Sequence, residues 1–186
     1  MDTIEAIFTR QSNGKIRPDP VPRELIEQLL SAAVQAPNHY KVRPWRFIVL
    51  SGAARERLGD LMAGLLAQAH PGLDETALAV ERAKPLRAPV LIAVGVELPA
   101  DPRVLEVENI CAAAAAAENL LLAAQALGLA AMWRTGAAAY APQVKAFLGL
   151  LPEQPLIAMI YIGFPDVLKL PAARPGFADR TVWMDV

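Results

Sequence analysis

The chain has 186 residues, a formal net charge of −1 and 54% hydrophobic residues. This length favours a single domain over residues 1–186, with a core of useful size. Lysines and arginines are scattered along the sequence, which argues against a nucleic-acid-binding surface. Two histidines far apart and one cysteine offer neither a metal-ligand cluster nor an internal disulfide. No stretch resembles a signal peptide, and we expect a cytoplasmic protein that spans no membrane.

Helices and short strands alternate along the chain, without an internal repeat. Helices are indicated by apolar residues at helical spacing, and strands by short apolar runs between turn residues. In chain order, we expect helices at 3–10 and 22–35, a strand at 45–50, helices at 53–69 and 74–84, a strand at 89–96, a helix at 104–127, a strand at 129–133, a helix at 137–148 and a strand at 156–163. The proline-rich segments 17–22 and 164–186 are expected to be irregular, with a candidate edge strand at 181–185. These elements predict an α+β fold in which helices wrap a small sheet.

The segment 104–127 is the centre of the predicted fold. It lacks proline and glycine and contains six consecutive alanines, Ala112 to Ala117, so its helix propensity is near the maximum. Gly128 is placed to end this helix. Because most of the other residues are apolar, we expect the helix to be buried nearly all round, inside protein rather than in a membrane. The excess of hydrophobic residues in the whole chain indicates an oligomer interface as a second buried surface.

Polar side chains stand at the ends of apolar elements, and the first such cluster is Arg10-Gln11-Ser12. A forked guanidinium and a hydroxyl at the end of a helix could bind a phosphate. The alternative is that Arg10 only compensates the helix dipole. In the polar loop at 36–44, His39 could contact a ligand or titrate near neutral pH, or it could simply be bonded to the backbone.

A third cluster, Trp133-Arg134-Thr135, ends the predicted strand before Gly136. A tryptophan there is most often part of the core, whereas a buried arginine must find an anion or a carboxylate. Glu106 and Glu108 of the central helix lie only two residues apart and therefore on different faces of it. We assign these carboxylates no acid–base role. The sequence lacks the glycine-rich phosphate loops, the H-E-x-x-H zinc motif and the G-x-S-x-G nucleophile elbow.

Taken together, these clusters resemble a known family. An R-x-S at the end of the first helix, then A-P-N-H with R-P-W, then W-R-T-G after an alanine-rich helix, follow the order found in the nitroreductase family of flavoproteins. The sequence is most similar to the compact YdjA-like branch of NAD(P)H nitroreductases, along nearly the whole chain. The resemblance implies a nitroreductase-like α+β fold, with a mostly antiparallel sheet around the long central helix. It also implies an intertwined homodimer with FMN between the subunits.

The resemblance further implies roles for individual residues. Within one subunit, the matching FMN-binding positions are Arg10, Gln11, Ser12, Trp133, Arg134 and Thr135. The first three match the segment that binds the phosphate and ribityl end of the flavin. Gln35 and His39 match FMN contacts that the neighbouring subunit is expected to provide.

The sequence departs from its relatives at two of these positions. Related sequences often carry arginine where Gln11 and Gln35 stand, so two phosphate-facing cations are missing. We still expect FMN to bind, with Lys15 or the tail cations Lys169 and Arg174 assisting.

The implied reaction is a flavin-dependent oxidoreduction, in which NADH or NADPH delivers hydride to flavin N5. A nitroaromatic, a quinone or a similar electron-poor acceptor then takes the same place, which predicts ping-pong kinetics. No side chain is needed as a catalytic residue, and Arg134 is the candidate cation that stabilises the reduced flavin. Two alternatives stay open. The same fold could reduce an enone or dehalogenate a ring, or the protein could bind flavin without turning over.

Overall fold

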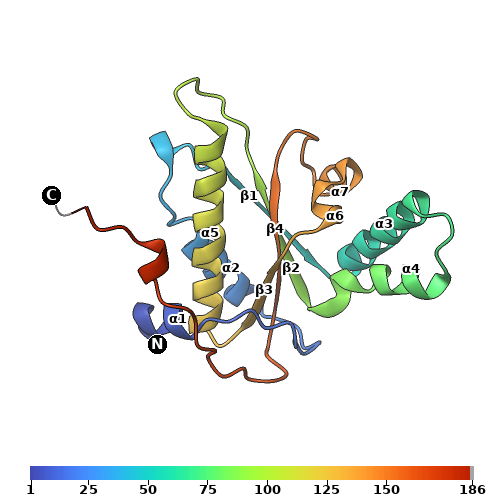
Figure 1. The fold of residues 1–186 in the computed structure, drawn as a ribbon. Helices are drawn as coiled ribbons and strands as arrows, with labels where there is room; N and C mark the ends of the chain where they lie inside the picture. The colour runs from blue at the N-terminus through green and yellow to red at the C-terminus, as the bar shows by residue number, and fades with distance from the viewer. Residues whose placement is uncertain (185–186) are drawn as a thin grey trace.

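The computed structural model describes residues 1–184 and shows helices on both faces of a single sheet (Figure 1). The helices are α1 (Thr3–Thr9), α2 (Arg23–Ala33), α3 (Ala53–Ala69), α4 (Glu75–Arg82), α5 (Glu106–Ala126), α6 (Ala137–Tyr140) and α7 (Pro142–Phe147). The strands are β1 (Trp45–Ser51), β2 (Val90–Val96), β3 (Ala130–Arg134) and β4 (Leu156–Gly163). Short 3-10 helices cover His39–Lys41, Lys84–Arg87 and Ala178–Arg180.

The four strands form one sheet in the order β1-β2-β4-β3, and every neighbouring pair is antiparallel. The edge strands are therefore β1 and β3. The central strand β2 is buried along its whole length, because helices cover both faces of the sheet. This arrangement confirms the predicted α+β fold with a small antiparallel sheet.

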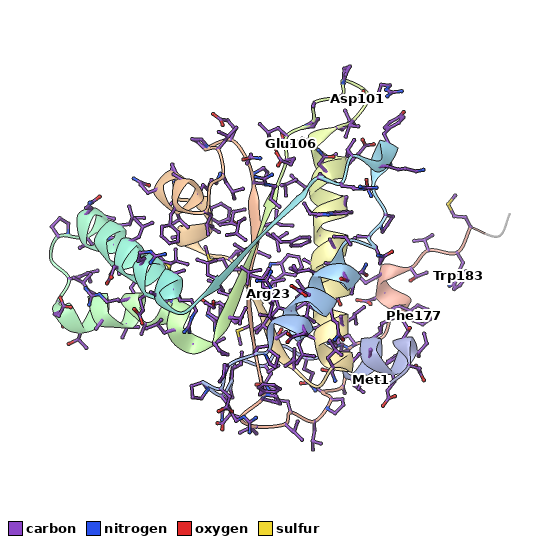
Figure 2. The ribbon with its side chains drawn as sticks, turned by 180° about the vertical axis from the view of Figure 1, so that it is seen from behind. Met1, Arg23, Asp101, Glu106, Phe177 and Trp183 are labelled. Carbon is purple, nitrogen blue, oxygen red and sulfur yellow. The ribbon has the colours of Figure 1, made fainter. Side chains whose placement is uncertain are left out.

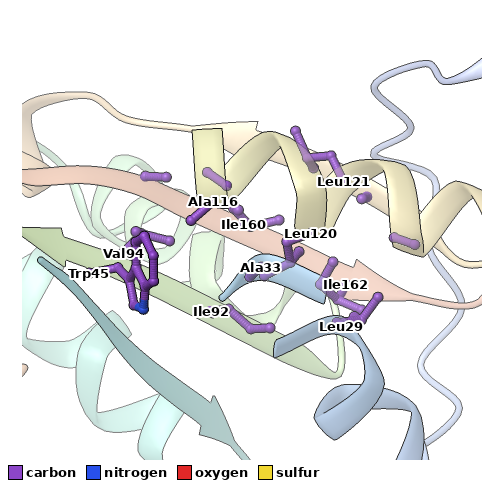
Figure 3. Close-up of a cluster of buried hydrophobic side chains, with 14 of the residues drawn as sticks. Leu29, Ala33, Trp45, Ile92, Val94, Ala116, Leu120, Leu121, Ile160 and Ile162 are labelled. Carbon is purple, nitrogen blue, oxygen red and sulfur yellow. The ribbon is translucent and has the colours of Figure 1, made fainter. Parts of the chain in front are cut away.

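The two faces of the sheet have separate hydrophobic cores. Ile92 and Val94 of β2 face α2 and α5, where they pack among residues such as Leu120 (Figure 3). Leu91 and Ala93 face the opposite way, toward α3, α6 and α7. Full burial of one such leucine contributes about 2 kcal/mol to stability. The larger core, between the sheet and α5, fixes the long helix against β3 and β4.

Helix α5 forms where the sequence predicts the long central helix, and it ends just before Gly128, as predicted. Gly128 adopts a positive φ of 73°, and the amide of Leu129 donates to the carbonyl of Ala124 at 2.8 Å, which closes the last turn. The expectation of burial all round is wrong for the single chain. Val107 is 59% exposed and Cys111 is also exposed, because no segment within residues 1–184 covers this stripe of the helix.

Several predicted boundaries are corrected by the structure. Helix α2 ends at Ala33, so Gln35 lies in the turn that follows it. The predicted helix at 137–148 divides into α6 and α7, because Pro142 cannot donate to a continuous helix and instead begins α7. Residues 181–184 form no strand, since this segment runs away from the sheet (Figure 1), and Asp185 lies outside the described residues.

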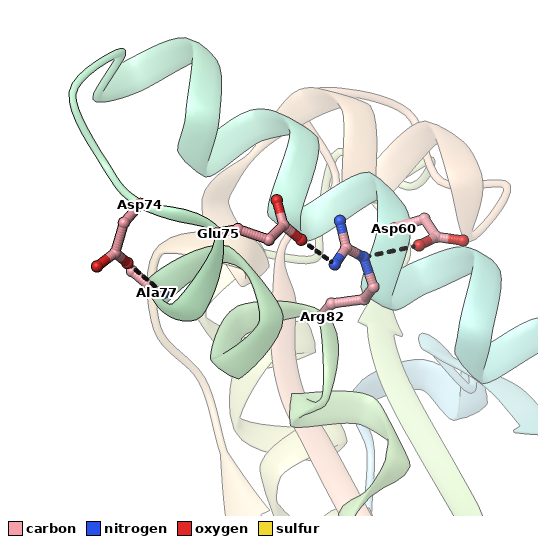
Figure 4. A network of polar contacts seen from close by, with 5 residues as sticks. All are labelled: Asp60, Asp74, Glu75, Ala77 and Arg82. Atoms are coloured by element: carbon pink, nitrogen blue, oxygen red, sulfur yellow. Dashed lines mark hydrogen bonds and ion pairs between the residues drawn. The ribbon is translucent and has the colours of Figure 1, made fainter.

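Helices α3 and α4 form a hairpin on the side of the sheet away from α5. Arg82 ties the two helices together, with Nε 3.1 Å from Asp60 and Nη1 2.9 Å from Glu75 (Figure 4). Gly59 lies so close to the Arg82 carbonyl that a Cβ atom there would overlap it. Pro85 then prevents α4 from continuing, and the chain enters the 3-10 helix at Lys84–Arg87.

After β4 the chain is mostly irregular, as predicted. It passes beneath the sheet and α1 and then extends beyond α5, opposite α3 and α4 (Figures 1 and 2). Phe177 and Trp183 on this C-terminal segment are 70% and 75% exposed. Large exposed aromatic side chains on an extended segment are typical of an interaction surface.

Candidate functional site

The first and third polar clusters meet at the edge of the sheet. Ser12 forms a parallel bridge with Ala131 of β3, and the amide of Asn13 donates to the carbonyl of Ala131 at 2.9 Å. The segment after α1 thus runs beside β3, whose end carries Arg134. The structure therefore brings together two clusters that are more than 100 residues apart in the sequence.

Asn13 holds this segment in place, although the sequence analysis did not single it out. Its side chain is buried and donates to the Val167 carbonyl at 2.8 Å, while its Oδ1 accepts from the amide of Lys15 at 3.0 Å. Gly14 allows the close approach to β3, because a Cβ atom there would overlap the side chain of Met132. The Asn-Gly pair was the available signal for such a turn.

Two cations of the C-terminal segment reach the same place. Arg174 donates to the backbone carbonyl of Arg10 at 2.8 Å, and Lys169 donates to that of Ser12 at 2.9 Å. The side chain of Gln11 donates to the Leu170 carbonyl, which attaches the segment a third time. Of the three cations expected to assist Arg10, the two in the tail thus contact the segment that carries it.

Arg10 itself is mostly buried, with 17% of its side chain exposed. Its Nε lies 3.4 Å from a carboxylate oxygen of Glu118 on α5. Lys169 and Arg174 contact the backbone of the same segment, so three cations and one carboxylate lie on or against it. This excess of positive charge is suited to a phosphate group.

The third cluster divides into a structural and an exposed part. Trp133 is half-buried against the larger core and donates from Nε1 to the Ile157 carbonyl at 3.0 Å, so its ring is held by the fold. Arg134 and Thr135 are exposed. Within residues 1–184, Arg134 has no carboxylate partner, and its nearest polar contact is the sulfur of Met132 at 2.9 Å. Its charge is therefore available to a ligand.

Arg134 and Thr135 line a cavity of about 430 Å³ between β3, β4 and α3, which we call the basic cavity. Its charged and polar walls are His70, Glu81, Lys84, Arg87, Arg134 and Tyr161. Burial raises the pKa of the Tyr161 hydroxyl above its ordinary value, although the charges of Arg134 and Arg87 act in the opposite direction. Tyr161 escaped the sequence analysis because it lies inside the apolar run of β4.

Gln35 and His39 lie elsewhere in the chain. Gln35 bonds to the Ser31 carbonyl at 3.2 Å, and His39 Nδ1 lies 3.1 Å from Glu108 near the start of α5. Ser12, in contrast, lies near the C-terminal end of α5, where Gln125 contacts the end of α1. Glu108 and Gln125 are separated by roughly 25 Å of helix. One subunit therefore does not bring His39 to the other cluster.

The loop that carries His39 is unusual in its backbone. Tyr40, Lys41 and Arg43 have positive φ angles of 46°, 57° and 51°. Asn38 stabilises the loop, because its Oδ1 accepts from the amide of Arg43 at 2.9 Å. Non-glycine residues in this region are costly and tend to occur at ligand-binding sites.

Two other possible functional features lie apart from these residues or are missing. A larger cavity, about 590 Å³, lies between α2 and the start of α3 and contains none of the predicted site residues. Among residues 1–184, no three His, Cys, Asp or Glu side chains are grouped closely enough to hold a metal ion. The edge of the sheet at β3 is thus the place where the predicted residues gather.

Comparison with known proteins identifies the chain's relatives. Residues 7–164 match the Nitroreductase family. The chain belongs to this family. An Escherichia coli K12 protein with the provisional name NAD(P)H nitroreductase YdjA is 30% identical over 169 residues, which cover 90% of each chain. These two findings confirm the resemblance to the nitroreductases and to their YdjA-like branch, and with it the expectation of an oxidoreductase.

Two solved structures have the same nitroreductase fold. A nitroreductase-like family protein from Bacillus cereus matches with a TM-score of 0.85 at 24% identity, covering 100% of this chain and 97% of that one. The FMN-dependent nitroreductase NfnB of Mycobacterium smegmatis, solved with NADPH, matches with a TM-score of 0.75 at 22% identity over 97% of each chain. The homodimer and the individual FMN contacts stay predictions of the sequence.

Proposed function

We propose that this nitroreductase-family chain is an FMN-dependent NAD(P)H oxidoreductase whose acceptors are nitroaromatics, quinones or similar electron-poor molecules. The observation that carries the proposal is the contact of Lys169 and Arg174 with the backbone of Ser12 and Arg10 beside β3. Arg134 stands at the end of the same strand. Ala131, which pairs with Ser12, is three residues from Arg134, or roughly 10 Å along the strand. This spacing suits a flavin mononucleotide, with its phosphate at one end and its ring at the other.

The residues present fit the cofactor. Arg10, Lys169 and Arg174 would bind the phosphate as charge-assisted donors. Arg134, which lacks a carboxylate partner within residues 1–184, would place a positive charge beside the ring. Bound FMN would supply the chemistry, by accepting hydride at N5 from NADH or NADPH and passing it to the acceptor in a ping-pong cycle. NfnB of Mycobacterium smegmatis, which shares the fold, is itself FMN-dependent.

The proposal includes a homodimer in which each site is completed by Gln35 and His39 of the other copy. Its support is the apolar surface that one chain leaves uncovered. Ile4 and Phe8 of α1 are 63% and 74% exposed, and the stripe of α5 with Val107 is exposed as well. Together with Phe177 and Trp183 on the extended C-terminal segment, these residues would be buried by a second copy.

A flavin-binding protein without turnover is the second candidate. It is favoured by the position of Gln11, whose side chain bonds to the C-terminal segment and adds no charge to the phosphate end. The two functions differ in their response to reductant. Bleaching of a yellow protein by one of the nucleotides requires electron transfer, which a binding protein does not perform.

The visible spectrum of the purified protein, before and after anaerobic addition of NADH or NADPH, tests the proposal. We expect flavin bands that bleach with at least one nucleotide and return when an acceptor is added. A colourless protein that takes up no added FMN would exclude a flavoprotein. A yellow protein that neither nucleotide bleaches would indicate a binding protein or a different reductant.

A further inference from the structure

The basic cavity has the size and lining of a small-molecule site. Its volume of about 430 Å³ lies within the usual range for such sites. Met62, Leu65 and Leu66 of α3 supply an apolar wall, and the charged groups come mainly from α4, the 3-10 helix at Lys84–Arg87 and the end of β3. This arrangement suits a ring with a polar substituent at one side.

The charges of the cavity are unbalanced. Lys84 pairs with Glu81, which is the only carboxylate among the lining residues. Arg87 and Arg134 have no carboxylate partner in the part of the chain that the structure describes. Two exposed guanidinium groups therefore remain at the cavity without an internal counter-charge, and each can donate charge-assisted hydrogen bonds to a bound anion.

Tyr161 adds a neutral donor to these two cations. Its side chain is only 6% exposed and lines the cavity, and its hydroxyl makes no hydrogen bond among residues 1–184. A tyrosine hydroxyl keeps its proton at neutral pH, and burial moves the pKa of Tyr161 further in the same direction. A carboxylate accepts hydrogen bonds from such a phenol and from guanidinium groups.

We propose that the basic cavity gives this chain a preference for acceptors that carry a carboxylate, which Arg87 and Tyr161 bind while the ring lies on the wall of α3. This inference rests on the proposed function and names the substrate class of the same site. Arg134 lines the cavity and is also the residue proposed to lie beside the flavin ring, so an acceptor bound here would lie near that ring. The phosphate of FMN is assigned to Arg10, Lys169 and Arg174, and Arg87 is left for the acceptor.

A pair of acceptors that differ only in charge tests the preference. The ratio of kcat/KM for 4-nitrobenzoate to that for 4-nitrobenzamide is measured with the natural chain and with three variants. We expect the ratio to favour 4-nitrobenzoate and to fall about tenfold in Arg87→Gln and about threefold in Tyr161→Phe. Arg57→Gln, an exposed change on α3 outside the cavity, is the matched control and should leave the ratio unchanged.

Binding without turnover gives an independent readout. Calorimetric titration of the purified protein with benzoate and with benzamide should show tighter binding of benzoate, and Arg87→Gln should remove the difference. A colourless protein that still prefers benzoate would defeat the flavin assignment and leave the cavity assignment standing. A protein whose flavin bleaches normally but which binds benzoate and benzamide equally would defeat the cavity assignment and leave the flavin assignment standing.

Three further results would overturn the inference. The first is an equal fall in kcat/KM for both acceptors in Arg87→Gln. The second is a lower FMN content in that variant, because the guanidinium would then serve the cofactor. The third is a change in the preference for NADPH over NADH without a change in the acceptor ratio, since the cavity would then bind the phosphate of the reductant.

Discussion

The two halves of the predicted flavin site differ in how far one chain builds them. Arg10, Ser12 and the end of β3 are assembled by backbone pairing and by two cations of the C-terminal segment. The loop with His39 lies near the opposite end of α5, with a strained backbone and an exposed surface. The first half is thus a product of folding within one chain, whereas the second half, in the proposed homodimer, would join it only across the interface between two copies.

The largest effect is expected from breaking the contact between chains. Cys111→Arg places a charge on the exposed stripe of α5, where a second copy is proposed to pack. We expect a monomer that binds FMN at least about 100-fold more weakly, because the partner's polar contacts are lost. Light scattering and flavin absorbance measure both properties, and Leu73→Arg, in the exposed turn between α3 and α4, is the control. A monomer with full FMN content would refute the shared site.

The next largest effect on FMN affinity is expected from removing a cation in the half of the site that contains Arg10 and Ser12. Arg10→Ala and Arg174→Ala each remove a charge from the phosphate end, and we expect FMN affinity to fall about tenfold or more. Flavin titration followed by fluorescence measures the change, with Arg57→Ala as an exposed control. Unchanged affinity in both variants would mean that the segment after α1 does not hold the phosphate.

A smaller effect on FMN affinity is expected from a change in the loop that carries His39. His39→Ala should weaken FMN binding about fivefold in the dimer, because one polar contact is removed. Its side chain is 60% exposed, so the unfolding free energy should change by less than about 0.5 kcal/mol. Comparing FMN affinity with chemical denaturation separates the two effects. A large loss of stability would show that His39 supports the fold of its own subunit instead.

The smallest effect is expected on the free energy of unfolding at alkaline pH. Because the pKa of Tyr161 is raised in the folded protein, this group stabilises the fold below the ordinary value of 10.0 and loses that contribution at higher pH. The unfolding free energy of the natural chain should therefore fall above pH 10.0, and less steeply in Tyr161→Phe. Urea denaturation at several alkaline pH values measures the slope, and identical slopes would contradict the assignment.

Much of the fold follows from the sequence because local signals agree with it. The predicted ranges of α3 and β4 match the observed ones, since turn residues bound an amphipathic stretch in one case and an apolar run in the other. Composition alone does not distinguish an apolar helix that its own chain covers on all sides from one that keeps an exposed apolar stripe. For that reason the exposed stripe of α5 was predicted to be buried.

The site was less accessible to such reasoning. The adjacency of Ser12 and Ala131 depends on one isolated bridge, which leaves no periodic pattern in the sequence. The family resemblance supplied the residues on both sides, and the structure supplied their pairing. Tyr161 reads as an ordinary core residue inside β4, because periodicity does not record which buried side chain borders a cavity.

The C-terminal segment carries both cations that are proposed to bind the FMN phosphate and aromatic residues that are proposed to pack against a second copy. Lys169 and Arg174 lie on the same irregular stretch as Phe177 and Trp183, and all four side chains are exposed in the single chain. Trypsin cleaves after lysine and arginine unless proline follows, so Lys169, which precedes Leu170, is a target, whereas Arg174, which precedes Pro175, is not. A cut after Lys169 would release Arg174 together with both aromatic residues. Resistance of the Lys169–Leu170 bond to digestion would then report the proposed cofactor loading and pairing of chains in one measurement, and a chain cut there would lose both at once.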